Sequence, residues 1–153
     1  MTLPVKSRRN FVRLLLTMPL ATMTLPVVGA SRQVEVWKDP TCGCCKEWIA
    51  ILRSAGFTVT AHDSGNVAAR QKAGIARQYG SCHTAIVDGY AIEGHVPVRE
   101  IERLLTERLD AIGLAVPGMV SGSPGMEQGG RVDPYTVLLL LRDGGSSAYA
   151  KYR

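Results

Sequence analysis

The 153-residue sequence has no internal repeat, and beyond its first thirty residues it has almost no excess of charge of either sign. Most of the net charge of +5 comes from the N-terminus: four of the 18 basic residues lie in the first thirty positions, which contain no acid. The other 14 basic residues face 13 acidic ones. Because nucleic-acid binding depends on a clustered basic surface, we expect no nucleic-acid partner. The length allows one domain, and the hydrophobic content of 46% is sufficient to fill its core.

The sequence also lacks an uninterrupted hydrophobic run long enough to cross a membrane. Its apolar stretch at residues 14–28 is short and is interrupted by Pro19 and Pro26, which disfavour a spanning helix. A basic segment precedes this stretch and small residues ending at Ala30 follow it, which is the pattern of a cleaved export signal. We therefore expect no stable membrane anchor after cleavage.

The basic segment at residues 7–13, SRRNFVR, resembles the twin-arginine export motif, in which paired arginines precede a large apolar residue. The expected organisation is an export signal at residues 1–30 and a single domain at residues 31–153, located in the periplasm. Disulfides persist in that compartment. Two disulfides are therefore the simplest structural role for the four cysteines, and any functional role has to be weighed against it.

Hydrophobic periodicity predicts the element order β-α-β-α-β-β-α for the first part of this domain. The expected strands are 34–38, 57–62 and two apolar runs on either side of residues 88–89, and the expected helical segments are 44–55, 67–79 with a break near Gly74, and one that starts at Pro97 and buries Ile101, Leu104, Leu105 and Leu109. Asp88-Gly89 favours the positive backbone angles of a tight hairpin turn.

Residues 113–134 are rich in Gly, Pro and Ser and have no period, so we interpret them as a long loop. Residues 135–152 return to strand character around a turn and predict a closing hairpin. The whole pattern indicates an α/β protein with a mixed central sheet flanked by helices. With cysteines at the first strand-to-helix junction, it resembles the thioredoxin-like fold, extended by a C-terminal loop and hairpin.

Three of the four cysteines, Cys42, Cys44 and Cys45, lie within four positions at that junction. The unpaired amides and positive dipole end of the following helix favour anionic sulfur, so these thiols are expected to ionise more readily than a free cysteine. Three neighbouring thiolates repel one another, and a soft cation relieves that repulsion. Thiolate ligands select Cu(I), zinc or iron–sulfur iron.

Cys42 and Cys45 also have the C-x-x-C spacing of thioredoxin-type redox pairs, which makes a thiol–disulfide oxidoreductase or a copper redox protein the main alternative. A redox pair has no use for a third thiol between its partners, whereas a shared-metal site uses one readily. Cys44 therefore favours metal binding over catalysis. Two disulfides fit less well, because a bridge between neighbouring cysteines is strained.

The fourth cysteine, Cys82, precedes the third predicted strand. In a thioredoxin-like fold the residues that enter this strand lie against the amino end of the first helix, so Cys82 is expected near the other three. Here His83-Thr84 stands where many thioredoxins have cis-proline and threonine. This difference weakens the ordinary redox interpretation and leaves room for a ligand.

Four further residues are weaker candidates for metal ligands. An imidazole at His83 can complete a copper or zinc site, although neighbours on an extended chain point in opposite directions. His95 lies at the end of the predicted hairpin, where it either binds metal or caps the next helix. Met119 and Met126 offer thioether sulfur, a soft copper ligand, or simply pack the loop onto the core. Zinc is the second choice of metal, because the adjacent Cys44 and Cys45 fit zinc ligand spacing poorly.

The segments CGCCKEW, SCHTAIVDGYAIEGHVP and GLAVPGMVSGSPGME together resemble the CopG-type family of exported copper-resistance proteins, a family long catalogued as a domain of unknown function. The resemblance covers almost all of residues 31–153. It implies copper binding in the periplasm through the C-x-C-C motif on a thioredoxin-like scaffold, with bridging sulfurs that hold several ions. The expected function is copper tolerance through the binding of Cu(I). We expect more than one copper ion per chain, and we expect other periplasmic copper-handling proteins as partners.

Overall fold

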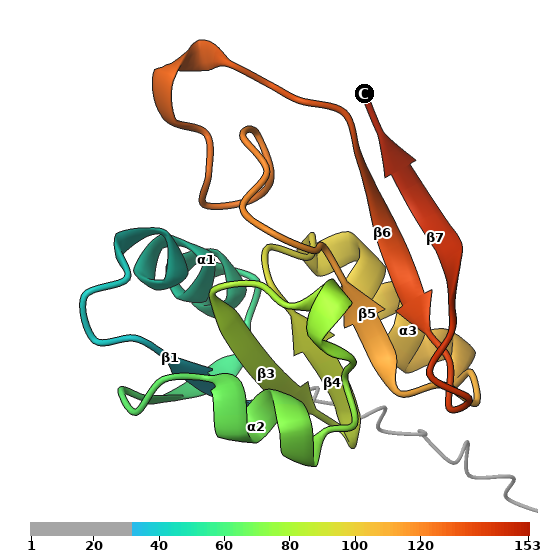
Figure 1. The fold of residues 1–153 in the computed structure, drawn as a ribbon. Helices are drawn as coiled ribbons and strands as arrows, with labels where there is room; N and C mark the ends of the chain where they lie inside the picture. The colour runs from blue at the N-terminus through green and yellow to red at the C-terminus, as the bar shows by residue number, and fades with distance from the viewer. Residues whose placement is uncertain (1–31) are drawn as a thin grey trace, which may run out of the picture.

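The computed structural model describes residues 32–153, which form one seven-stranded mixed sheet with helices on both faces (Figure 1). The strands are β1 (Gln33–Lys38), β2 (Thr58–His62), β3 (His83–Val87), β4 (Tyr90–Glu93), β5 (Gly113–Ala115), β6 (Tyr135–Leu140) and β7 (Ser146–Tyr152). The helices are α1 (Gly43–Ser54), α2 (Val67–Lys72), α3 (Val98–Glu107) and the 3₁₀ turns η1 (Arg77–Tyr79) and η2 (Gln128–Gly130). The predicted export signal lies outside the described residues. Within residues 32–153, no helix has the length and apolar character needed to cross a membrane.

The sheet has the strand order β2-β1-β3-β4-β5-β6-β7. Strand β1 pairs parallel with β2 and antiparallel with β3, and β3 pairs antiparallel with β4. Apolar residues alternate with polar ones along β1, so Val34 and Val36 face the core. Helices α1 and α3 pack on that same face through Trp48, Leu52 and Leu104, all fully buried. The predicted order β-α-β-α-β-β-α and the mixed α/β fold are confirmed.

The local turn signals are also confirmed. Asp88 and Gly89 have φ angles of 46° and 84°, the left-handed pair that closes the β3–β4 hairpin. The predicted break near Gly74 separates α2 from η1. Helix α3 ends at Glu107, earlier than predicted, because Arg108 adopts a left-handed cap with φ of 52°. Leu109 therefore packs against the core from outside the helix.

The prediction of an unbroken loop from residue 113 to 134 is wrong at its start, because residues 113–115 form β5 between β4 and β6. A β-carbon at Gly113 would lie 1.7 Å from the Ala91 carbonyl oxygen, so glycine is what allows the two strands to approach. The short segment has no alternating pattern, and its partners lie far away in the sequence. The remaining loop, residues 116–134, passes over the amino end of α1 before the predicted hairpin of β6 and β7 (Figure 1).

Candidate metal centre

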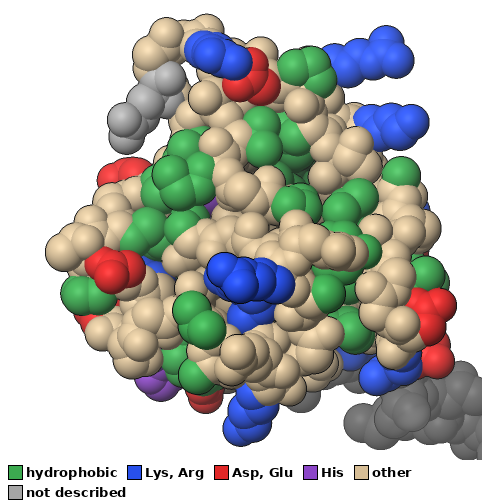
Figure 2. Space-filling model, in the orientation of Figure 1, with side chains coloured by type: hydrophobic (Ala, Val, Ile, Leu, Met, Phe, Trp, Pro, Cys, Tyr) green, Lys and Arg blue, Asp and Glu red, His purple; other side chains and the backbone are tan. Residues whose placement is uncertain are grey.

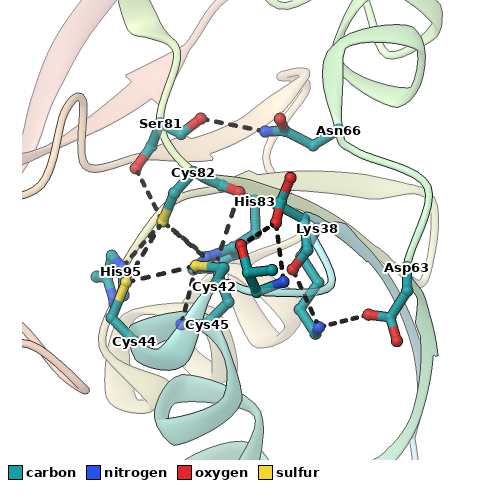
Figure 3. The surroundings of a disulfide bond; sticks show 12 residues. Lys38, Cys42, Cys44, Cys45, Asp63, Asn66, Ser81, Cys82, His83 and His95 are labelled. Carbon is teal, nitrogen blue, oxygen red and sulfur yellow. Dashed lines mark hydrogen bonds and ion pairs between the residues drawn. A yellow bond between two sulfur atoms is a disulfide. The ribbon is translucent and has the colours of Figure 1, made fainter.

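The turn between β1 and α1 places the first three cysteines as predicted. Strand β1 ends at Lys38, and Cys42 is the N-cap of α1, where its sulfur accepts a hydrogen bond from the Cys45 amide at 3.3 Å. Cys44 and Cys45 occupy the first helical turn (Figure 3). The amide groups that remain unpaired at a helix start surround these sulfur atoms with positive potential.

The pairing of β1 with β3 brings in the fourth cysteine. His83 is opposite Lys38 in the antiparallel register, so Cys82, one residue earlier, reaches the amino end of α1. The sulfur of Cys82 lies 3.5 Å from that of Cys45 and 4.0 Å from that of Cys44, and the sulfurs of Cys42 and Cys44 are 3.5 Å apart. All four sulfur atoms lie within 4.8 Å of one another.

The structure contains a disulfide between Cys42 and Cys45, whose Cα atoms are 5.4 Å apart. Cys44 and Cys82 are free thiols, and both are partly exposed. The bridge joins the C-x-x-C pair, as a redox interpretation requires, and the other two sulfurs remain in contact with it. Within the described residues there is one disulfide and not two, so the two-bridge explanation does not hold for this state.

His95 contacts the cluster from the end of the β3–β4 hairpin. Its Nε2 atom lies 3.2 Å from the sulfur of Cys82, and its Nδ1 atom lies 2.8 Å from the Pro124 carbonyl oxygen. Because a carbonyl oxygen only accepts, Nδ1 must carry the proton and Nε2 presents its lone pair to the sulfurs. Burial lowers the pKa of His95, so the ring is neutral at physiological pH and suited to bind a metal ion.

His83 lies deeper, with its ring 4.3 Å from that of Trp48 and 4.9 Å from that of His95. Its Nδ1 atom is 3.5 Å from the sulfur of Cys82, so the two neighbouring side chains do come together. Its Nε2 atom is buried and has no hydrogen-bond partner among residues 32–153. Burial, and then the nearby His95, lower the pKa of His83 to about 3, so this imidazole stays neutral.

The loop after β5 brings both predicted methionines to the cluster. Cys44, Met119, Ser121 and Met126 line a surface pocket of about 300 Å³. Met119 is one of the few large hydrophobic side chains that are mostly exposed, at 59%. Of the predicted candidates, the structure thus brings His83 and His95 against Cys82, and the two methionines to the pocket at Cys44.

A buried polar network holds Cys82 in place, and the sequence reasoning missed it. Glu93 is fully buried and accepts hydrogen bonds from the Ser81 amide at 2.6 Å, the Thr84 hydroxyl at 2.5 Å and Nε of Arg70 at 2.8 Å. Arg70 and Asn66 donate to the Ser81 carbonyl oxygen at 2.7 and 3.1 Å. Burial raises the pKa of Glu93 although these three donors oppose it. The only signal in the sequence is an acid that ends an otherwise apolar strand.

Burial determines whether the Cys82 sulfur carries a charge. Burial and the neighbouring Cys44 raise the pKa of Cys82 to about 11, so without metal this thiol is neutral at physiological pH. A metal ion bound here would replace the proton and supply the positive charge that stabilises a buried thiolate. Once the Cys42–Cys45 bridge is reduced, four sulfurs and a neutral imidazole form a soft donor set, which fits soft metal ions better than hard cations such as Mg²⁺.

Comparison with known proteins relates this chain to copper resistance proteins. Residues 79–126 match a family described as "Protein of unknown function, DUF411". A solved structure named copper resistance protein copG, form 2, is 46% identical over 80% of this chain and 99% of its own, with a TM-score of 0.76. Form 1 of that protein is 47% identical over 78% of this chain and 96% of its own, with a TM-score of 0.73. No curated protein matches the chain.

Proposed function

This chain belongs to the CopG family of copper resistance proteins, and on that premise we propose that it is a periplasmic protein that binds Cu(I) through its clustered cysteines. It serves copper tolerance by storing, buffering or handing on the ion. The proposed ligands are the sulfurs of Cys42, Cys44, Cys45 and Cys82.

The observation that carries this proposal is the convergence of four sulfur atoms from two distant segments within 4.8 Å. Thiolates that share metal ions neutralise their mutual repulsion, and Cu(I) is the common soft ion that accepts low coordination numbers. Four sulfurs this close support bridging, so we propose that more than one copper ion binds per chain. Zinc remains the competing metal, because four thiolates also meet its preference.

His95 extends the proposed donor set. Its Nε2 lone pair faces Cys82, and the Pro124 carbonyl holds the ring in that orientation. His83 offers its Nδ1 atom at slightly longer range. Both rings are neutral, so neither has to lose a proton before it binds a metal ion.

A second function, thiol–disulfide exchange or copper redox chemistry, is favoured by the disulfide between Cys42 and Cys45. In that state two of the four sulfurs are unavailable as thiolates, so reduction must precede full copper loading. The two functions make different demands on Cys44. A redox pair works without it, whereas a shared copper site loses a bridging ligand.

The test begins with anaerobic, fully reduced protein, which is titrated with Cu(I) in the presence of a chromophoric chelator. We expect several copper ions per chain, sulfur-dominated X-ray absorption and a short copper–copper distance. Cys44→Ser should lower the copper content. If this variant keeps its copper content while disulfide reductase activity requires Cys42 and Cys45, the enzyme function is correct and the storage function is wrong.

A further inference from the structure

Both methionines in the described part of the chain lie beside the cysteine cluster. Met119 and Met126 line the same pocket, and its other walls are Cys44 and Ser121. Hydrophobic side chains are grouped on this surface between α1 and the loop that follows β5 (Figure 2). Cys44 is the single cysteine of the cluster that lines the pocket, so it is the thiol that an ion in the pocket meets first.

Exposure of the sulfur-bearing residues decreases from the pocket toward the core. Met119 is 59% exposed, Cys42, Cys44 and Cys82 are partly exposed, and Cys45 is completely buried. Cys44 then connects to the rest of the cluster, since its sulfur is 3.5 Å from that of Cys42 and 4.0 Å from that of Cys82. A series of sulfur atoms therefore runs from solvent to the buried side of the cluster.

The type of sulfur ligand also changes from the pocket toward the core, from thioether to thiolate. A thioether is a neutral, soft ligand that binds Cu(I) without losing a proton and does not form disulfides. A thiolate binds Cu(I) more strongly because it carries charge. Weaker ligands outside and stronger ligands inside are the order expected for an ion that is captured first and then transferred inward.

The methionine loop is held against the cysteines. A β-carbon at Gly125 would lie 2.9 Å from the Trp48 amide nitrogen and 3.0 Å from the Cys44 carbonyl oxygen, so the loop backbone packs directly on the first turns of α1. The Gly118 amide donates to the Gly80 carbonyl at 3.0 Å, two residues before Cys82. These contacts fix the position of both methionines relative to Cys44 without requiring the loop to move.

We propose that Met119 and Met126 form the access point through which Cu(I) enters and leaves the cysteine cluster, with Cys44 as the first thiolate to receive it. This inference rests on the proposed copper-binding function. The step is a ligand exchange: a copper–thioether bond breaks as a copper–thiolate bond forms at Cys44, whose proton passes to water. Copper remains Cu(I), and no electron is transferred.

The test compares rates with amounts. Reduced protein is mixed by stopped flow with the Cu(I)–bicinchoninate complex, and the loss of its colour gives the transfer rate. For the double variant Met119→Leu with Met126→Leu we expect transfer about tenfold slower, equivalent to about 1.4 kcal/mol in the barrier, with an unchanged number of ions bound. Met119→His should restore much of the rate in the Met126→Leu background, because imidazole is another neutral copper ligand. Val67→Leu, an exposed apolar control on α2, should change nothing.

The outcomes distinguish an access point from resident methionine ligands and from a failure of the proposed copper binding. Slow transfer with full loading supports the access point. Unchanged rates in the double variant, or a loss of bound copper at unchanged rate, overturn it, and the second result makes the methionines resident ligands instead. If the unaltered reduced protein takes up no Cu(I), the proposed function itself fails.

Discussion

The Nε2 atom of His95 lies 3.2 Å from the sulfur of Cys82, although thirteen positions separate them in the sequence. The β3–β4 hairpin creates this proximity, because the antiparallel pairing brings the end of β4 back beside the start of β3. Gly94 makes the last step possible, because its φ of 71° is in the left-handed region and a side chain there would meet Ser81 and Val116. The fold thus brings the predicted candidate His95 to the cysteine cluster.

Replacement of His95 by alanine should weaken Cu(I) binding by about 10-fold to 100-fold, the range typical for groups that hold or support a metal ligand. Competition with a chelator of known affinity measures this change on reduced protein. His62→Ala is the matched control, since that ring stacks on Trp37 and contacts Glu35 away from the cluster. Equal affinity for both variants would remove His95 from the ligand set.

Alkylation should distinguish the two free thiols of the structure from the two cysteines in the disulfide. Protein unfolded without reductant should take up two alkyl groups, at Cys44 and Cys82, because Cys42 and Cys45 are bridged. After reduction it should take up four, and saturation of the folded, reduced protein with Cu(I) should protect these sites. Mass spectrometry of the intact chain and its peptides gives both the number and the positions. A bridge that involves Cys82 would contradict the assignment.

Glu93→Gln should destabilise the protein by about 3 kcal/mol, because the largely buried Arg70 guanidinium loses the carboxylate that balances its positive charge. Urea denaturation at neutral pH measures the free energy of unfolding. The same variant should bind copper more weakly, since Glu93 holds the Ser81 amide next to Cys82. Glu102→Gln, an exposed change on α3, is the control and should leave both quantities unchanged. Wild-type copper affinity in a destabilised Glu93→Gln protein would show that the network supports only the fold.

Gly125→Ala should displace the methionine loop, because the added carbon would lie within about 3 Å of the α1 backbone. Gly129→Ala provides a closely matched control: its φ of 76° is similar to the 83° of Gly125, but its β-carbon would have no neighbour within 4 Å. The backbone strain is therefore common to both variants, and the steric contact belongs to Gly125 alone. We expect slower copper transfer and a lower melting temperature for Gly125→Ala than for Gly129→Ala. Identical behaviour of the two would mean that the loop position does not matter.

Local signals in the sequence predicted the elements that position the site. The alternation in β1, the period of α1 and the Asp88-Gly89 turn depend on neighbours within a few residues, so they can be recognised without tertiary information. The expectation that Cys82 approaches the first helix required more, namely a fold. It was correct because β3 pairs antiparallel with β1, which places the start of β3 beside the end of β1 that leads into α1.

Other features could not be recognised in this way. Strand β5 has only three residues and depends on β4 and β6 on either side of it. The ion pair of Glu93 and Arg70 joins side chains 23 positions apart. The apolar strand that Glu93 ends is the only sign of its burial in the sequence, and nothing there indicates Arg70 as its partner. Such features arise when distant segments remove one another from water, which is a property of the packed chain.

The sequence by itself determined that three sulfurs gather at the start of a helix, because spacing along the chain and the local strand-to-helix change suffice to place them. The sequence also offered Cys82, His95 and the two methionines as candidate partners, but only the tertiary structure decided how close each of them comes to those sulfurs. These side chains come from separate strands and loops, and sheet register and close backbone packing set the distances between them.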